Sequence, residues 1–404
     1  MLPAITLSVI ALISIKLDPR LAFATFAIAT LIYSNKGSLK LSIRNPSNED
    51  SYFNAYLLAT FLSLLACFAI PRDVVYTSIF LIFVHELRRD AIWNIAAYTS
   101  ASLFYFLAFY LLTDLHFNTA QTFFIALAGG LTASLVESVE TDADKRFTLM
   151  IALSTVFTIF RIYVPSASIF DLSLAFFASF LLSLLALYTG VADESGLMSA
   201  TLVGTTLILF TDFRFFAVLL LFYTLGSAFT KYRYEIKQSR GIAEQAGGAR
   251  GYTNVFGNSL APLFFAIQYG VTHNQFFAAA FVASVAAALA DTTASEVGKA
   301  ENNVYLITNF HKVEPGVSGG VSFKGEISAL ATSFLTTVLS FLMGIIGIYA
   351  AIIAAISAFI GVHIDSILGA TLEEKGYLTN SGVNFLATFL AGVICFLLLF
   401  QFPS

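Results

Sequence analysis

The residues most able to do chemistry lie near the C-terminal end of an apolar run, 276–290. Asp291 and Glu296 follow this run directly, among three hydroxyl residues. An ionised side chain near membrane depth costs roughly 2.5–3.5 kcal/mol on insertion scales, so it usually faces a protein interior and serves a function. Carboxylates together with substrate phosphates suit Mg²⁺, and we therefore predict that Asp291 and Glu296 are metal ligands. The alternative for Glu296 is an ion pair with a loop lysine such as Lys299.

A loop of small residues, 315–322, lies a short distance after these acids. Such a loop is rich in free backbone N–H groups, which can form a nest around phosphate. Lys312 stands just before the loop and could place its ammonium over the same anion. The alternative is an ordinary glycine-rich turn between helices. The predicted anion contacts are Lys312 and the loop residues Gly316, Ser318, Gly319, Gly320 and Ser322.

Further polar residues interrupt the helices on either side. Asp365, at the end of another apolar helix, could be a second metal ligand or a base, or a helix-end acid paired with a lysine. If 250–260 is helical, Arg250, Asn254 and Asn258 form one polar stripe that could bind a nucleotide, and the alternative is a solvated helix end. Two further asparagines open the final helix: Asn380 could be only its N-cap, whereas Asn384, deeper in the helix, is a candidate nucleotide contact.

The composition identifies the kind of protein that must position these residues. The chain of 404 residues is 58% hydrophobic and 11% charged, with a mean hydropathy of +0.82. A soluble domain carries about 25% charged residues. The apolar runs are continuous rather than alternating, which favours helices over a membrane barrel. We predict an all-α polytopic integral membrane protein with about 11–14 transmembrane helices, some short or broken.

The distribution of polar residues predicts two regions. Residues 1–190 form a largely apolar membrane region, and residues 191–404 carry polar motifs at almost every helix end. The segment 231–250 holds five basic and two acidic residues, so the positive-inside rule places it, and the polar motifs, on the cytoplasmic face. Cys67 and Cys395 lie in apolar runs and form no metal or disulfide pattern.

The polar motifs, in this order, resemble the integral membrane family of transmembrane protein 19 and plant phytyl-phosphate kinase, over roughly 190–404. That family is related to CTP-dependent polyprenol kinases and CDP-lipid synthases. Residues 1–190 resemble a degenerate or accessory polyprenol kinase region through Arg88-Arg89 and the segment 137–144. The motifs are Gly247-Gly248-Ala249-Arg250 with Asn254 and Asn258, Ala290-Asp291-Thr292 with Ser295 and Glu296, Pro315-Gly316 with Ser318-Gly319-Gly320-Val321-Ser322, and Asp365-Ser366 with Gly369-Ala370-Thr371.

The resemblance implies transfer of a phosphoryl group from CTP, or another nucleoside triphosphate, to an isoprenyl monophosphate. Asp291, Lys312 and Asp365 would be the catalytic residues, with Mg²⁺ held by Asp291, Glu296 and Asp365. The expected partners are an isoprenoid lipid phosphate, a nucleotide and the bilayer. No nucleic-acid partner is expected, and the sequence gives no oligomeric state.

Two other functions fit the same motifs. A CDP-lipid-forming cytidylyltransferase or a polyprenol kinase would use the same metal and nucleotide, and its products would distinguish it. An ion-coupled transporter or a lipid scramblase would also place acids and helix breaks in the membrane. The polar motifs crowd near helix ends rather than at the midplane, which favours an enzyme.

Overall fold

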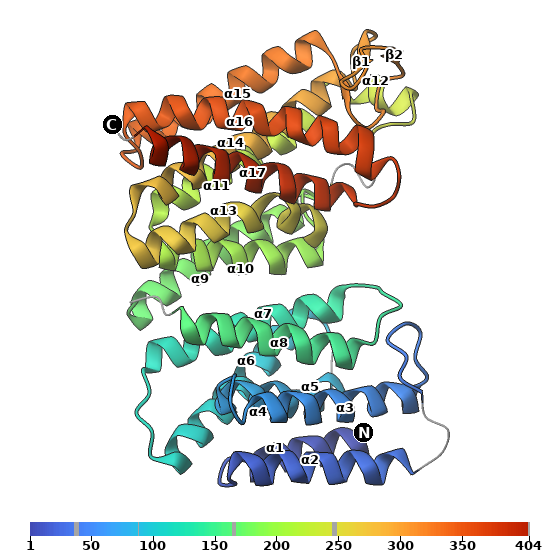
Figure 1. The fold of residues 1–404 in the computed structure, drawn as a ribbon, viewed down its shortest axis with the longest axis vertical. Helices are drawn as coiled ribbons and strands as arrows, with labels where there is room; N and C mark the ends of the chain where they lie inside the picture. The colour runs from blue at the N-terminus through green and yellow to red at the C-terminus, as the bar shows by residue number, and fades with distance from the viewer. Residues whose placement is uncertain (36–39, 88, 164–166, 245–248, 403–404) are drawn as a thin grey trace. The chain divides into compact units, whose positions relative to one another are not determined.

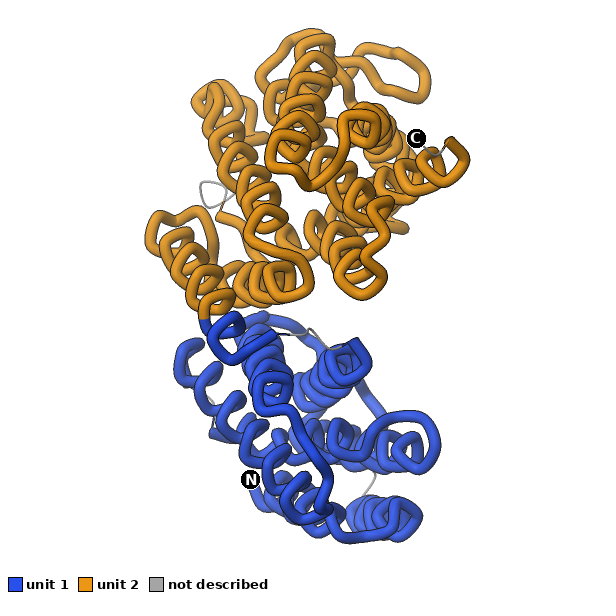
Figure 2. The backbone as a smooth tube through the Cα atoms, turned by 90° about the vertical axis from the view of Figure 1, so that its left-hand side faces the viewer, with its two compact units in different colours: residues 1–173 blue, residues 174–404 orange. Residues whose placement is uncertain are grey.

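The protein is built almost entirely from helices (Figure 1). The computed structural model describes residues 1–404 except 36–39, 88, 164–166, 245–248 and 403–404. The chain divides into two compact units, residues 1–173 and 174–404, and the division falls inside helix α9 (Ile169–Tyr188) (Figure 2). The roles predicted for residues 1–190 and 191–404 stay a prediction.

Within the described residues, eight helices are long and apolar enough to cross a membrane. The all-α polytopic prediction is therefore confirmed. Three shorter apolar helices accompany them, and the expected 11–14 crossings stay a prediction. The eight long segments are Ala91–Thr113, Thr119–Ser138, Ile169–Tyr188, Phe213–Thr230, Gln275–Gly298, Phe323–Leu342, Ile348–Glu373 and Asn380–Gln401, and the shorter helices are Leu2–Ile13, Pro19–Ser34 and Glu194–Phe210.

The first unit is a set of packed helices with capped ends. Asp144, for example, accepts hydrogen bonds from the backbone N–H groups of Arg146 and Phe147 at the start of α8. Such a cap satisfies N–H groups that have no partner within the helix. The helices are α1 (Leu2–Ile13), α2 (Pro19–Ser34), α3 (Asn48–Leu65), α4 (Arg72–Phe80), α5 (Ile82–His85), α6 (Ala91–Thr113), α7 (Thr119–Ser138) and α8 (Lys145–Ile162).

The second unit carries the predicted chemistry and adds a small sheet to its helices. Three short antiparallel strands follow α14 in the spatial order β2-β1-β3, with Val304 opposite Val313 and Tyr305 opposite Val321. The elements after α9 are α10 (Glu194–Phe210), α11 (Phe213–Thr230), α12 (Tyr234–Ser239), α13 (Tyr252–Thr272), α14 (Gln275–Gly298), β1 (Val304–Leu306), β2 (Lys312–Val313), β3 (Gly320–Val321), α15 (Phe323–Leu342), α16 (Ile348–Leu368), a π-helical turn (Gly369–Glu373) and α17 (Asn380–Gln401).

Helix α14 is the centre of this unit, because α11, α13, α15, α16 and α17 all pack against it. Its residues 278–290 are buried all round and are mostly alanine. Small side chains let neighbouring helices approach closely, which is how helices associate in membranes. An added Cβ on Gly361 of α16 would lie 3.2 Å from the Cβ of Ala287 and 2.8 Å from that of Ala391. The three helices α14, α16 and α17 are therefore held in direct contact.

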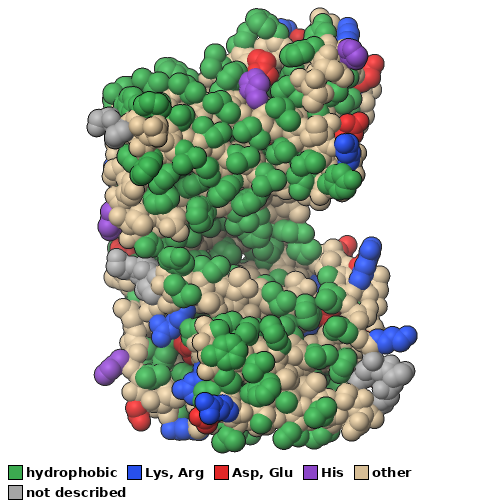
Figure 3. Space-filling model, in the orientation of Figure 1, with side chains coloured by type: hydrophobic (Ala, Val, Ile, Leu, Met, Phe, Trp, Pro, Cys, Tyr) green, Lys and Arg blue, Asp and Glu red, His purple; other side chains and the backbone are tan. Residues whose placement is uncertain are grey.

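Charged side chains are sparse over most of the visible face of the second unit. Figure 3 shows hydrophobic side chains across its middle, with charged groups gathered at the end that carries the strands in Figure 1. A long apolar surface next to a charged rim is what a bilayer requires of the protein it surrounds.

Several helices begin earlier or end later than the apolar runs indicate. Helix α13 starts at Tyr252, and α14 continues to Gly298 rather than stopping at residue 290. Hydropathy finds the apolar middle of a helix, whereas the hydrogen-bonded helix continues through polar turns. Asn254, Asn258 and Asp291 consequently lie inside helices.

Candidate functional site

A polar pocket lies where the C-terminal ends of α14 and α16 meet the start of α15 and the small sheet. We call it the carboxylate pocket; its volume is about 400 Å³. It collects side chains and backbone from segments far apart in the chain. The described residues that line it are Asp291, Ala294, Ser295, Gly298, Lys299, Val304, Gly316, Val317, Ser318, Gly319, Gly320, Val321, Ser322, Gly325, Glu326, Val362, Asp365, Ser366, Gly369, Glu373 and Asn380.

Two of the predicted acids meet in this pocket. The side chains of Asp291 on α14 and Asp365 on α16 lie within hydrogen-bonding reach of each other. The Oδ2 atom of Asp365 is buried and has no hydrogen-bond partner among the described residues. Two neighbouring carboxylates in such a place repel each other unless a proton or a cation lies between them. The pair is therefore built to share a positive charge.

Two predicted asparagines lie beneath this pair. A cavity of about 10 Å³ is lined by Asn258 of α13 and Asn384 of α17, together with both carboxylates. That volume is about the room one water molecule needs. The Nδ2 group of Asn258 donates to the backbone oxygen of Asn254 at 3.0 Å. The amides therefore add polar atoms below the carboxylates, at a depth that is otherwise apolar.

The predicted phosphate loop borders the same pocket. Gly319 has φ +76°, and an added Cβ there would lie 2.4 Å from the Cβ of Ala370 and 2.5 Å from the backbone oxygen of Ser366. Only glycine fits such a close approach in the left-handed conformation. No backbone acceptor is assigned within the described chain to the N–H groups of Ser318 and Gly319. The loop thus lies against the end of α16 with free donors.

Ser322 has a structural task at the edge of the pocket. Its hydroxyl accepts a hydrogen bond from the N–H of Gly325 at 3.1 Å and so caps α15. The N-terminus of a helix of this length presents N–H groups and a partial positive charge, both of which favour anions. Ser322 therefore orients the start of α15 toward the pocket, and its hydroxyl is already engaged.

The lining of the carboxylate pocket is strongly acidic. Four carboxylates line it, and Lys299 is the one lysine or arginine among its described lining residues. The Nε2 atom of His363 lies 3.3 Å from Oε2 of Glu326, at the α15–α16 contact. A polyphosphate entering this pocket would be repelled unless divalent cations came with it. The carboxylates are Asp291, Glu326, Asp365 and Glu373.

The carboxylate oxygens of this pocket fit a Mg²⁺ ion that keeps some of its water ligands and also binds substrate phosphates. Within the described residues no cluster of three or more histidines, cysteines or acids forms a complete metal cage. Mg²⁺ is usually held by one or two carboxylates plus phosphate oxygens rather than by such a cage. The Asp291–Asp365 pair, with its unpaired Oδ2 atom, supplies this kind of half-site.

Glu296 was predicted as a third metal ligand, and the structure places it elsewhere. Its carboxylate is buried and forms ion pairs with Lys237 and, at 2.6 Å, with Lys299. Glu296 follows Asp291 by five residues on α14. Because an α-helix has 3.6 residues per turn, the two side chains point to different sides of the helix. The alternative reading, a pair with Lys299, is confirmed, and the predicted metal role of Glu296 lacks support from the geometry.

Lys312 also lies away from the carboxylate pocket. It is exposed on β2, and its Nζ atom donates to Oδ1 of Asn303 at 3.0 Å. The strand carries it to a separate surface pocket with Asn302 and Pro315 rather than to the acids. Lys312 is close to the glycine loop in sequence but not in space, because β2 and β3 lie on opposite sides of β1.

The predicted stripe of Arg250, Asn254 and Asn258 is wrong in its first member. Arg250 precedes α13 and its N–H donates to the backbone oxygen of Val191 at 2.8 Å. Arg250 and Asn254 are absent from the described lining of the carboxylate pocket. Burial lowers the pKa of the Arg250 guanidinium. Gly247 and Gly248 of the same motif lie outside the described residues.

The sequence analysis did not predict that four of the lining residues belong to this pocket. Lys299 was considered only as a partner of Glu296, and Asn380 only as an N-cap. The cap of α17 is Thr379, whose side chain accepts from the N–H of Gly382, which leaves Asn380 free to face the pocket. Glu326 and Glu373 carried no spacing signal, although the π-helical turn that holds Glu373 is a feature common at functional sites.

The charged residues of the first unit form hydrogen-bonded networks. His85 Nδ1 and the hydroxyl of Tyr98 both contact Oε1 of Glu137, at 2.6 and 2.7 Å. The Asp144 side chain, which caps α8, also accepts from Ser51 and Asn54. Arg88 lies outside the described residues. These contacts give Glu137 and Asp144 internal partners, whereas Glu140 between them is exposed.

Comparison with known proteins is consistent with the predicted resemblance. The family model described as "Integral membrane protein DUF92" matches residues 177–392. The membrane protein sll0875 of Synechocystis is 36% identical over 229 residues, which are 55% of this chain and 89% of that protein. The membrane protein MJ0933 of Methanocaldococcus jannaschii is 31% identical over 204 residues, or 50% and 83% of the two chains.

A plant relative is also similar over about half of the chain. The chloroplastic protein VTE6 of Arabidopsis thaliana is 30% identical over 221 residues, which are 52% of this chain and 66% of that protein. No solved structure matches the chain significantly.

Proposed function

Because this chain belongs to the integral membrane protein family DUF92, we propose that it is a membrane prenyl-phosphate kinase. It transfers a phosphoryl group from CTP, or another nucleoside triphosphate, to a prenyl monophosphate and forms a prenyl diphosphate. The matched segment, 177–392, contains every described residue of the carboxylate pocket. The resemblance of the motifs to phytyl-phosphate kinase supports the choice of acceptor.

One observation carries the proposal. The Asp291–Asp365 pair faces a pocket that also receives the free N–H groups of the glycine loop and the start of α15. Phosphoryl transfer needs positioning and charge neutralisation more than covalent chemistry, and these groups provide both. Asp291 and Asp365 would hold Mg²⁺, which when bound would neutralise charge on the nucleotide phosphates.

The chain's own groups then have separate tasks. The N–H groups of Ser318 and Gly319 would orient phosphate oxygens, and the ammonium of Lys299 would balance charge as it develops. The bond between the γ-phosphorus and its bridging oxygen breaks, an acceptor phosphate oxygen bonds to that phosphorus, and CDP leaves. An acceptor phosphate is already ionised, so no general base is required of the pocket.

The test uses the purified chain in detergent with Mg²⁺ and CTP labelled on the γ-phosphate. Phytyl monophosphate and phytol are offered as acceptors, and a parallel reaction uses CTP labelled on the α-phosphate. We expect γ-label in phytyl diphosphate. Asp291→Asn should lower that transfer on the order of 10²–10³-fold, since it removes charge from the cation site. Glu374→Gln, an exposed acid next to the pocket, is the matched control and should transfer normally.

Other products would replace the proposal. Label from the α-phosphate appearing in lipid, with release of pyrophosphate, would make the chain a cytidylyltransferase. Transfer to phytol alone would make it a polyprenol kinase. Absence of any lipid-dependent nucleotide turnover, in protein that gel filtration shows to be intact, would favour transport.

A further inference from the structure

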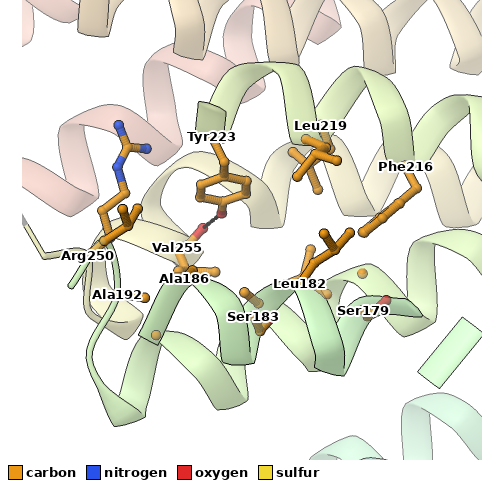
Figure 4. A pocket seen from close by; sticks show the side chains of 16 residues that line it. Ser179, Leu182, Ser183, Ala186, Ala192, Phe216, Leu219, Tyr223, Arg250 and Val255 are labelled. Carbon is orange, nitrogen blue, oxygen red and sulfur yellow. Dashed lines mark hydrogen bonds between the residues drawn. The ribbon is translucent and has the colours of Figure 1, made fainter. Parts of the chain in front are cut away.

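A second, apolar pocket lies between α9, α10 and α11 within the second unit, and we call it the Arg250 pocket. Its cavity volume is about 90 Å³. Figure 4 shows Arg250 at one end and Phe216 with Ser179 at the other, with aliphatic side chains such as Leu219 between them. The lining suits a hydrocarbon chain, because almost all of it is apolar.

The charged group at the end of this pocket, Arg250, forms no ion pair with a described residue. Arg250 is only 5% exposed, and its Nη1 atom has no hydrogen-bond partner among the described residues. Its guanidinium lies over the rings of Phe222 and Tyr223, at 5.1 and 5.7 Å from their centroids. A buried, unpaired charge carries a desolvation penalty of several kcal/mol, which a partner would offset. The Arg250 guanidinium therefore has room for an anionic ligand.

The guanidinium extends toward the helix that carries the carboxylate pair. An added Cβ on Gly226 would lie 2.6 Å from Nη2 of Arg250 and 3.5 Å from the methyl group of Thr292. Thr292 directly follows Asp291 on α14. Ser227, next to Gly226, and Asn254 also have buried side-chain oxygens without partners in the described chain. Two polar groups that lack described partners thus follow directly on Gly226 and precede the lining residue Val255.

We propose that the Arg250 pocket binds the prenyl monophosphate acceptor. The isoprenoid chain enters the apolar cavity, and the phosphate pairs with the Arg250 guanidinium, whose planar fork matches phosphate oxygens. The cavity takes the first part of the chain, and the rest extends out of it into the bilayer. The identity of this ligand rests on the proposed function.

Charge complementarity separates the two substrates between the two pockets. The carboxylate pocket is acidic and suits a nucleotide that arrives with cations, whereas a lipid monophosphate needs a protein cation of its own. The Arg250 pocket offers that cation and an apolar lumen, but few polar groups for a ribose or a base. It therefore selects an amphiphile over a nucleotide.

The experiment measures binding of geranylgeranyl monophosphate to the full chain in detergent without nucleotide. Arg250→Met keeps the stem and removes the charge, and we expect at least tenfold weaker binding. Arg250→Lys keeps the charge but loses the fork, so its binding should lie between the two. Ala186→Trp fills the cavity and should also weaken binding tenfold, whereas Leu185→Trp on the exposed face of the same helix should not. Gel filtration and Mg²⁺–CTP binding show that each variant is folded.

Several results would overturn the assignment. These are equal binding of geranylgeraniol, displacement by inorganic phosphate or phosphatidic acid at equal concentration, and unchanged binding by Arg250→Met and Ala186→Trp. The proposed function fails separately: binding that depends on Arg250, without any phosphoryl transfer, would keep the lipid site and reject the kinase. Phosphoryl transfer by a protein whose lipid binding does not depend on Arg250 would keep the kinase and reject this lipid site.

Discussion

Lys299 is held in place by a buried network rather than by its own sequence neighbours alone. Glu296 pairs with it at 2.6 Å and also pairs with Lys237, whose Nζ donates to the backbone oxygen of Thr230. Two lysines paired with one carboxylate leave one net positive charge. Of these three residues, Lys299 is the one that lines the carboxylate pocket. Glu296 therefore positions a cation for phosphate instead of binding the metal.

This network makes Lys299 and Lys312 distinguishable. Lys299→Met should lower kcat for phosphoryl transfer by about 10- to 100-fold, because the pocket loses its lysine among four carboxylates. Lys312→Met should change kcat less than twofold, because its ammonium is exposed and bonded to Asn303. Steady-state kinetics with γ-labelled CTP measures both. Equal losses of kcat in the two variants would show that Lys312 also acts in phosphoryl transfer.

The contact between the glycine loop and the end of α16 is the element-level feature on which the pocket depends. Gly319→Ala should destabilise the protein by about 1–3 kcal/mol, because alanine is strained at φ +76° and also collides with Ala370 and Ser366. Gly376→Ala is the matched control: its φ is +73°, but nothing lies within 4 Å of an added Cβ. Thermal unfolding in detergent should show a larger loss of stability for Gly319→Ala than for Gly376→Ala. The difference between the two losses measures the cost of the collision apart from the backbone strain.

The start of α11 should respond to acid. Burial raises the pKa of Asp212, but its hydrogen bonds and ion pair with Arg214 more than offset this, so the pKa lies below its ordinary value. A depressed pKa means stabilisation that is complete above the unfolded-state pKa, about 3.9, and is lost as pH falls through the folded-state pKa. Wild type should therefore lose more thermal stability than Asp212→Asn between pH 5 and pH 3. Identical acid profiles would contradict this.

The sequence predicted helices and motifs better than it predicted their ends and partners. Asp291, Asp365, Asn258 and Asn384 were each chosen singly because a polar group in an apolar run needs a reason, and the structure brings them together. The pairing of Glu296 with Lys237 could not be read from sequence, because the two are 59 residues apart and meet only through tertiary packing. The placement of β2 and β3 on opposite sides of β1, which separates Lys312 from the glycine loop, is likewise a tertiary feature.

The orientation of the whole molecule in the membrane rests on fewer charges than the sequence indicated. Of the basic residues in 231–250, Lys237 and Arg250 are buried, whereas Lys231 and Arg233 are exposed. Lys237 pairs with Glu296, so its charge is balanced within the protein. The cytoplasmic placement of the carboxylate pocket is therefore a prediction that needs a direct test.

Helix α15 offers that test, because its 20 residues give a length of about 30 Å, enough to cross the bilayer. Cysteine is placed at Ser318 near one end or at Gly347 near the other, in a background of Cys67→Ser and Cys395→Ala. A membrane-impermeant maleimide should label Ser318→Cys from the cytoplasmic side and Gly347→Cys from the opposite side. The reverse pattern would place the pocket outside the cytoplasm.

The central position of α14 has a consequence for synthesis. This helix is surrounded by segments made before it, α11 and α13, and by segments made after it, α15, α16 and α17. Asp291 therefore leaves the ribosome before Asp365, and before Asn384 on the last helix. A nascent chain must carry an unmatched acid in the bilayer or at its edge until the C-terminal helices arrive. Premature termination ahead of α17 should thus yield a substrate for membrane quality control rather than a partly active enzyme.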